Sequence, residues 1–123
     1  MAWTYIQTSG RLLNPYGVFT AVGYSGCGDG KNNPTEENIR CVGPIPEGIY
    51  DIEEPIDSPL HGPFAMHLLP SVENIMYGRS AFLIHGDSLN MPGGASEGCV
   101  ILSKPVREKI WNSNDHVLQV VKN

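Results

Sequence analysis

Residues 81–102 decide the fold predicted for this chain. They begin with Ala81-Phe82-Leu83-Ile84-His85 and end with Cys99-Val100-Ile101-Leu102. Both runs are short, apolar and rich in residues that favour extended backbone, so each is predicted to be a buried β-strand. Residues 86–98 between them contain glycine and proline and are predicted to form a loop. Such a loop allows the ends of the two strands to come together, which would place His85 opposite Cys99.

The rest of the chain is also predicted to be rich in β-structure. Further strands are expected at 2–8, 11–14, 17–23, 49–54, 64–69 and 116–121, and a loop at 25–33. The first three strands are separated by Ser9-Gly10 and by Asn14-Pro15-Tyr16-Gly17, which are turn-forming sequences. They therefore predict an antiparallel meander.

Two short helices are expected. Asn33 is a candidate N-cap for a helix that ends near Arg40, with Pro34 in the first turn and Glu36 in a capping box. Ser103 is a candidate N-cap for a longer helix over 104–112. Its inner face is expected to consist of Val106, Ile110 and Trp111. The predicted fold class is mostly β with one or two short helices.

Length and composition bound the class of protein. The 123 residues fit one domain, expected over 1–123, and 41% hydrophobic with 17% charged residues is ordinary globular composition. The net charge is -5 and no Lys/Arg run is present, which argues against nucleic acid and anionic membranes as partners. No apolar run reaches the roughly 18 residues of a membrane span, so no membrane insertion is expected. The N-terminus lacks a signal-peptide pattern, so synthesis in the cytoplasm is expected.

The chain has an odd number of cysteines, namely Cys27, Cys41 and Cys99, so they cannot all pair within it. One arrangement is a Cys27–Cys41 disulfide that closes a glycine-rich loop and leaves Cys99 free, as in a protein that works in an oxidising compartment. The other is three unrelated reduced thiols.

Cys99 and His85 are candidates for nucleophilic catalysis. A thiol at its ordinary pKa is only slightly ionised at neutral pH, so a nucleophilic cysteine needs an adjacent base or cation. His85 is a candidate base, Gly98 permits close backbone approach, and the backbone N–H groups of 97–99 are candidates for an oxyanion hole. Taken alone, the same residues also fit a buried small cysteine and a satisfied histidine.

The whole string has a more specific pattern. His85-Gly86 followed by Ser96-x-Gly98-Cys99-Val100 resembles the signature of YkuD-type L,D-transpeptidases. Further stretches resemble the type VI secretion effectors called Tlde1, in a likeness that extends from Trp3 almost to the C-terminus. These stretches are Tyr24-Ser25-Gly26, Gly30-Lys31-Asn32-Asn33-Pro34, Gly43-Pro44-Ile45-Pro46, Gly78-Arg79-Ser80, Phe82 to Ser88 and Ala95 to Cys99.

The resemblance implies a small YkuD-like β-sandwich and a cysteine acyl-enzyme mechanism without a cofactor. Cys99 would attack peptidoglycan stem tetrapeptides and release the terminal D-alanine. Water would then complete an L,D-carboxypeptidase reaction, and a free D-amino acid an L,D-transpeptidase exchange. The implied setting is the periplasm of a target bacterium. The implied partners are a cognate immunity protein and a secretion-spike or adaptor protein.

One position departs from the YkuD pattern. Ile101 stands where the usual pattern has an arginine two residues after the cysteine. Arg79 is the candidate replacement for contact with the substrate carboxylate, and a surface arginine is the alternative. Asp87 is either an orienting group for His85 or a loop carboxylate. Ser96 either hydrogen-bonds within the site or caps a turn.

Four other positions match family motifs and are candidates for the substrate groove: Ser25, Lys31, Asn32 and Gly86. Turn formation alone also explains glycine and asparagine in such segments. His61 and His67 belong to no motif and are expected to be structural or exposed.

Other functions remain open at this point. A zinc site built from His61, His85 and Cys99 lacks the usual ligand spacing, so no metal is expected. A peptidoglycan endopeptidase or a housekeeping cell-wall enzyme would use the same nucleophile. A non-enzymatic β-rich binding module with an inert Cys99 is the alternative outside enzymes.

Overall fold

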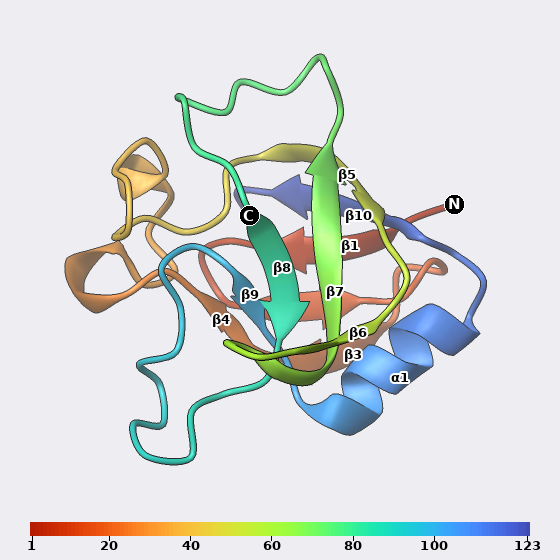
Figure 1. Ribbon diagram of the computed structural model, residues 1–123. Helices are drawn as coiled ribbons and strands as arrows, with labels where there is room; N and C mark the ends of the chain where they lie inside the picture. The colour runs from red at the N-terminus through yellow and green to blue at the C-terminus, as the bar shows by residue number, and fades with distance from the viewer.

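The computed structural model describes residues 1–123 and is built around one continuous, curled β-sheet (Figure 1). The strand order is β3-β2-β1-β10-β5-β7-β8-β9-β4, and β6 pairs with β7 outside this path. The strands curl into a nearly closed barrel, so the predicted mostly β class is confirmed. The strands are β1 (Trp3–Ile6), β2 (Arg11–Leu13), β3 (Phe19–Val22), β4 (Tyr24–Ser25), β5 (Gly48–Ile52), β6 (Ile56–Ser58), β7 (Gly62–Pro70), β8 (Phe82–His85), β9 (Val100–Ile101) and β10 (Val117–Val121).

Gly23 brings the two ends of the sheet together. β3 and β4 are the outermost strands of the order, yet only Gly23 separates them in the chain. The Gly23 amide donates to the Gly10 carbonyl at 2.7 Å, and a Cβ at position 23 would lie 2.0 Å from the Ile101 carbonyl oxygen. Only glycine fits such a close approach of backbones, so the chain itself nearly closes the barrel at this point.

The core follows from alternation along the strands. In β1, Trp3 and Tyr5 point inward and are buried, and β10 contributes Leu118 and Val120. β8 is buried at every position, as expected for a central strand with both faces covered. Fifteen buried hydrophobic side chains form one cluster inside the curled sheet. That cluster supports the strand ends on which the candidate site lies.

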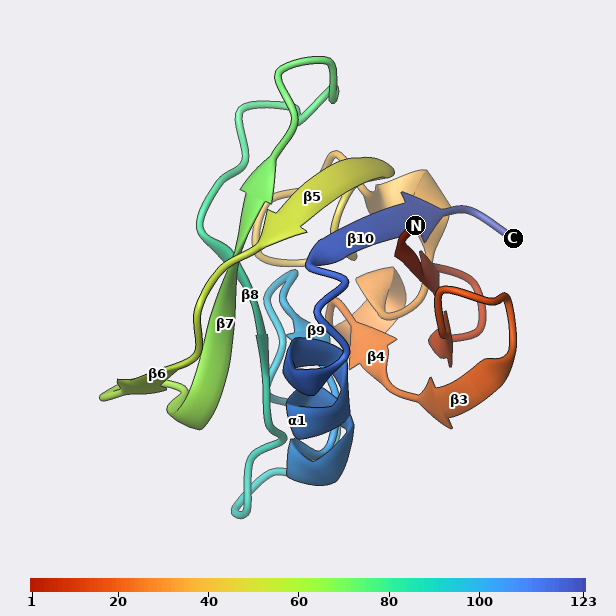
Figure 2. The ribbon, with the colours of Figure 1, turned by 90° about the vertical axis from the view of Figure 1, so that its right-hand side faces the viewer.

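The helix α1 (Lys104–Asn112) lies against β7 and β8 at one end of the barrel (Figure 2). Ile110 is fully buried in the core cluster, and Val106 and Trp111 pack against it, which confirms the predicted inner face. Arg107 is also buried on this helix, which the sequence analysis did not anticipate. Ser103 occupies the N-cap position without making a side-chain capping bond.

Two local predictions were wrong, and one strand was not predicted. The helix expected to reach Arg40 is limited to a 3₁₀ turn, η2 (Pro34–Glu36), although Asn33 caps it by accepting from the Thr35 amide at 3.2 Å. Residues 37–43 form turns and no regular helix, and Cys41 adopts a left-handed φ of +63° that a right-handed helix does not accommodate. The loop expected at 25–33 contains part of β4 and a second 3₁₀ turn, η1 (Gly28–Gly30), and β6 was missed.

The pairing of β8 with β9 positions the chemistry. These two strands run parallel, with Ile84 opposite Val100 and His85 opposite Ile101. His85 therefore ends β8 at the level of β9, and Cys99 lies immediately before β9. The helix of the structure is too short and too polar to cross a membrane.

Candidate active site

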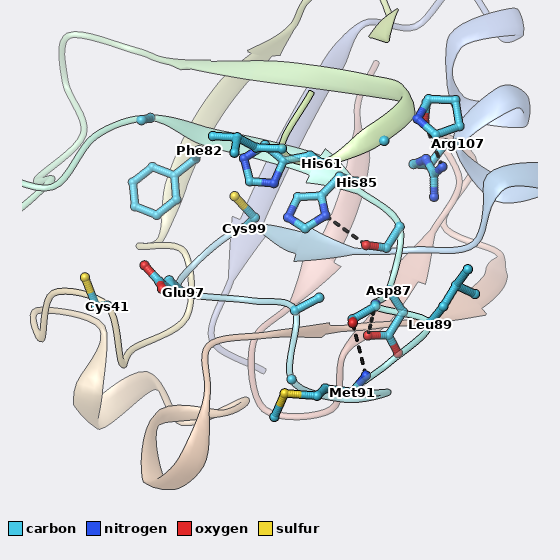
Figure 3. Close-up of a pocket in the computed structure, with 18 of the residues that line it drawn as sticks. Cys41, His61, Phe82, His85, Asp87, Leu89, Met91, Glu97, Cys99 and Arg107 are labelled. Carbon is cyan, nitrogen blue, oxygen red and sulfur yellow. Dashed lines mark hydrogen bonds between the residues drawn. The ribbon is translucent and has the colours of Figure 1, made fainter. Parts of the chain in front are cut away.

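A large open cleft contains both Cys99 and His85. Its volume is about 1250 Å³, and it lies between the turn preceding β7, the loop over 86–98 and the N-terminus of α1 (Figure 3). Four of the eight Lys and Arg residues line it, against two of the thirteen Asp and Glu residues. These residues are Arg40, Arg79, Lys104, Arg107, Asp87 and Glu97. The cleft is therefore richer in cationic groups than the acidic chain as a whole, which suits an anionic ligand.

His85 is held in one orientation and one tautomer. Its Nδ1 lies 2.8 Å from the carbonyl oxygen of Gly86, which only accepts, so Nδ1 must carry the proton and donate. Nε2 is therefore the basic nitrogen of the neutral ring. It is buried and makes no hydrogen bond. Burial lowers the pKa of His85, the Gly86 bond partly offsets this, and the charges of His61 and Arg107 lower it further.

Cys99 lies beside His85 at the start of β9 (Figure 3). Its Sγ accepts a hydrogen bond from the Leu83 amide at 3.4 Å, so β8 contributes a donor to the sulfur. Burial raises the pKa of the Cys99 thiol, and Glu97 adds to the rise, whereas the Leu83 amide and Arg79 oppose it. Both shifts favour the uncharged forms of the pair, a neutral thiol and a neutral imidazole.

Two serines hold the turn that precedes Cys99. The Ser96 Oγ accepts from the amides of Gly26 at 2.8 Å and Gly98 at 3.0 Å, and donates to the Cys99 carbonyl at 2.6 Å. The Ser25 Oγ donates to the Gly98 carbonyl at 2.9 Å and accepts from the Ile45 amide at 2.8 Å. Ser96 thus hydrogen-bonds within the turn, and Ser25 supports it from behind.

Gly98 is required by both conformation and space. Its φ is +134°, a value that residues with a side chain rarely adopt. A Cβ at this position would lie 2.5 Å from Arg79 Nη2 and 2.8 Å from the Phe82 ring. The close approach presses the turn onto Arg79 and fixes the start of β9.

Arg79 is buried and its guanidinium is occupied by backbone. Nη1 donates to the carbonyls of Glu37 at 2.6 Å and Pro44 at 2.8 Å, and Nη2 to those of Gly43 at 3.0 Å and Glu97 at 3.3 Å. Burial lowers its pKa. Arg79 is therefore not a surface arginine, which was the alternative. Its guanidinium joins the turn at 43–44 to the turn before Cys99. All four Nη hydrogens are used, which leaves little capacity for a substrate carboxylate.

Asp87 does not contact His85. Its carboxylate accepts from the Tyr24 hydroxyl at 2.6 Å and from the amides of Ser88 at 2.8 Å and Gly93 at 3.0 Å. Burial acts to raise the pKa of Asp87, but these hydrogen bonds and Lys31 outweigh it, so the pKa is lowered. The orienting group for His85 is the Gly86 carbonyl, and Asp87 is the loop carboxylate.

The four remaining candidates divide into two groups. Gly86 lines the cleft, where a Cβ would lie 2.9 Å from Arg107 Nη1. Ser25 is fully buried behind the nucleophile turn. The Asn32 Oδ1 accepts from the Ser25 amide at 3.2 Å, and Lys31 lies over the Tyr24 ring at 4.5 Å. None of these three residues lines the cleft.

The predicted Cys27–Cys41 bridge is not formed in the structure, in which all three thiols are free. The Cys27 Sγ points at the carbonyl oxygen of Cys41, 3.2 Å away, and not at its sulfur. Cys41 instead lines the cleft (Figure 3). The two cysteines are close in space, but their side chains do not face each other.

His61 is the site residue that motif reasoning missed. It lies in the turn between β6 and β7, lines the cleft, and stacks on His85 with ring centroids 4.4 Å apart and planes 30° apart. No local sequence signal identifies it, because the contact joins residues far apart in the chain. His67, by contrast, is exposed on β7 outside the cleft, as expected. No group of three or more His, Cys, Asp or Glu side chains is arranged to hold a metal ion.

Comparison with known families finds one matching family model. The family model of the Tlde1 domain matches residues 20–123. The chain belongs to the Tlde1 domain family. The Tlde1 match covers β3 through β10, including the whole candidate site, whereas β1 and β2 lie outside it. The Tlde1 domain indicates a type VI effector family. No curated protein matches the chain.

Proposed function

We propose that this Tlde1 domain is a cysteine L,D-carboxypeptidase and L,D-transpeptidase that acts on peptidoglycan stem tetrapeptides. The observation that carries the proposal is the fixed tautomer of His85 beside Cys99. The Nδ1 bond to Gly86 makes Nε2 the basic nitrogen, and no other group occupies it. A buried base without a partner, next to a thiol in a large cleft, is the arrangement that covalent catalysis by cysteine requires.

The proposed reaction begins with proton transfer. His85 Nε2 takes the Cys99 thiol proton as the sulfur attacks the carbonyl carbon between the diamino acid and the terminal D-alanine. The backbone N–H of Cys99 has no hydrogen-bond partner in the structure, whereas that of Gly98 is bonded to Ser96. Of the three candidate amides, those of Glu97 and Cys99 are therefore unpaired, and we assign the Cys99 amide, on the nucleophile itself, as the donor to the oxyanion.

Collapse of the tetrahedral intermediate breaks the C–N bond. The His85 imidazolium gives its proton to the leaving nitrogen, D-alanine departs, and the peptide remains on Cys99 as a thioester. In the carboxypeptidase branch, His85 removes a proton from water, which hydrolyses the thioester to a tripeptide and restores the thiol. In the exchange branch, the amine of a free D-amino acid takes the place of water.

The charge of the cleft supports this substrate class. Stem tetrapeptides carry a terminal carboxylate, and the cleft concentrates cationic side chains in a chain of net charge -5. The proposal includes action in the periplasm of a target bacterium, a cognate immunity protein and a secretion-spike or adaptor partner. Membership in the Tlde1 family supports this setting.

The test is to incubate a disaccharide-tetrapeptide with wild type and with Cys99→Ala, with and without a D-amino acid, and to identify the products by mass. We expect wild type to yield tripeptide and, with the D-amino acid, the exchanged tetrapeptide. Cys99→Ala should yield neither. Failure of folded wild type to form either product would contradict the proposal, and cleavage of crosslinked dimers alone would indicate an endopeptidase.

A further inference from the structure

The carboxylate of the substrate needs a partner among the side chains of the cleft. The leaving D-alanine bears a carboxylate on the carbon attached to the scissile nitrogen. Because His85 protonates that nitrogen, the partner of the carboxylate must lie close to the His85 ring. Ile101 is apolar, buried and paired with His85 in the sheet, so it offers no contact.

The two buried arginines of the cleft are committed to backbone. Arg79 uses both Nη atoms on four carbonyls. Arg107 donates from Nε to the Phe64 carbonyl at 3.0 Å, from Nη2 to that of Pro63 at 3.1 Å, and from Nη1 to that of Leu102. A carboxylate bound by the Nη atoms of Arg79 would have to displace these bonds. Arg107 uses three of its five N–H groups, so three carbonyls fix its orientation, although one N–H on each Nη stays free.

The side chain of His61 is polar, lines the cleft and makes no hydrogen bond. Its backbone amide, by contrast, donates to the Ser58 Oγ at 3.1 Å. The carbonyls of Pro63 and Phe64, just after it, are held by Arg107. The turn is thus fixed on both sides, and the ring is held against His85 (Figure 3). These contacts hold the free imidazole of His61 beside His85, where the leaving-group carboxylate must lie.

We propose that His61 binds the terminal carboxylate of the substrate and so supplies the recognition that the missing arginine at position 101 leaves open. This inference rests on the proposed function for its substrate. An imidazole N–H donates to a carboxylate in either protonation state. A carboxylate bound at this place also stabilises the imidazolium that forms on His85 during reaction.

The test uses two alkylating reagents that differ in charge. Iodoacetate carries a carboxylate and iodoacetamide is its neutral counterpart, and both react with the same Cys99 thiolate. The ratio of their rates at one pH therefore cancels changes in thiolate fraction and reports recognition of the carboxylate. We expect His61→Ala to lower the iodoacetate-to-iodoacetamide ratio by roughly 10-fold, the loss of one charge-assisted hydrogen bond.

The chain offers matched controls. His67→Ala removes an exposed histidine of the next strand, and Lys109→Ala removes an exposed cation of α1 outside the cleft. Both should leave the ratio unchanged. His61→Gln keeps an N–H donor and should lie between wild type and His61→Ala. An unchanged ratio in His61→Ala, or an equal fall caused by Lys109→Ala, would overturn the assignment.

A substrate experiment separates this inference from the proposed function. Wild type is compared with His61→Ala on a tetrapeptide and on its C-terminal carboxamide. We expect wild type to favour the carboxylate form, and His61→Ala to lose that preference mainly through KM. If wild type processes no tetrapeptide but its iodoacetate preference depends on His61, the proposed reaction fails and the carboxylate site stands. Equal preference in both proteins contradicts the role of His61.

Discussion

Tyr24 donates a 2.6 Å hydrogen bond from its hydroxyl to the Asp87 carboxylate, and the same hydroxyl accepts from the Ala95 amide at 2.9 Å. One phenol on β4 therefore bridges both ends of the loop over 86–98. Burial raises the pKa of Tyr24 to about 12, and the bond to Asp87 adds to the rise. The pair remains a neutral phenol and a carboxylate across the ordinary pH range, and it closes the loop beside the nucleophile.

Removing this hydroxyl is expected to loosen the loop. Tyr24→Phe should lower kcat by several-fold and leave the thermal stability close to that of wild type, because the lost bonds lie in an exposed loop. Asp87→Ala should act in the same way, and the double variant should be no worse than either single one. Steady-state kinetics on the tetrapeptide provide the measurement.

The same variants distinguish the two roles considered for Asp87. An orienting carboxylate for His85 would shift the acid limb of the pH–rate profile when removed, whereas loss of Tyr24 would not shift it. The charge of Asp87 is the smallest cause that acts on the pKa of His85, which it raises, so we expect at most a small downward shift in Asp87→Ala and none in Tyr24→Phe. A large shift confined to Asp87→Ala would restore the orienting role.

Arg79 is expected to act through stability. Arg79→Ala leaves four buried or half-buried carbonyls without their donor, and should lower the free energy of unfolding by about 3 kcal/mol or more. Arg79→Lys keeps the charge but cannot reach four acceptors with one amine, so it should fall between wild type and Arg79→Ala. Urea denaturation measures both. Full stability with a raised KM would instead indicate that Arg79 binds substrate.

Ser96 is expected to affect both stability and rate. Ser96→Ala leaves the buried amides of Gly26 and Gly98 unpaired, at a cost of about 1–3 kcal/mol each before relaxation. The Cys99 carbonyl loses its donor at the same time, so the nucleophile should be held less firmly and kcat should fall. Ser25→Ala, which supports the same turn from behind, is the matched comparison and should be destabilised with a smaller loss of kcat. An active, fully stable Ser96→Ala would contradict this account of the turn.

The pH dependence follows from the lowered pKa of His85. The neutral ring is the base, so kcat/KM should fall only when the pH drops below a value that lies under the ordinary 6.5 of histidine. The rate of iodoacetamide labelling in the free protein should rise at alkaline pH, because the pKa of Cys99 is raised. An acid-limb midpoint above 6.5 would contradict a lowered pKa of His85, whereas a loss of activity at alkaline pH as an imidazolium deprotonates would indicate a thiolate–imidazolium pair in the resting state.

Stability should change in the same acid range. The unfolded chain takes up a proton on His85 near pH 6.5, whereas the folded protein does so only at lower pH, so stability falls as the pH drops through this window. His85→Gln removes the titrating group and should lose less stability between pH 7 and pH 5 than wild type does. Denaturant midpoints at a series of pH values provide the test, and parallel curves would show that His85 contributes nothing.

The sequence predicted the parts of the site that depend on local pattern. The apolar runs that end at His85 and begin at Cys99 indicate two buried strands, and the structure pairs them side by side. The inner face of α1 was equally readable from the spacing of Val106, Ile110 and Trp111. Local periodicity was sufficient in these segments because burial dictates the pattern directly.

Long-range contacts were beyond such reasoning. The stacking of His61 on His85 and the bonds from Arg107 to the backbone before β7 join segments that only the closed sheet brings together. The hydrogen bonds from Arg79 to backbone carbonyls could not be predicted for the same reason. Its position in the sequence indicated proximity to the site, but only the turns at 43–44 and 97 show what the guanidinium binds.

The most direct test of the central claim is the intact mass of the protein after rapid mixing with the tetrapeptide. We expect a transient adduct of the tripeptide acyl group on Cys99, absent in Cys99→Ala and slow to form in His85→Ala. The adduct should disappear when a D-amino acid is added in excess. Product formation by wild type without any adduct, or an adduct that persists in Cys99→Ala, would contradict a thioester intermediate on Cys99.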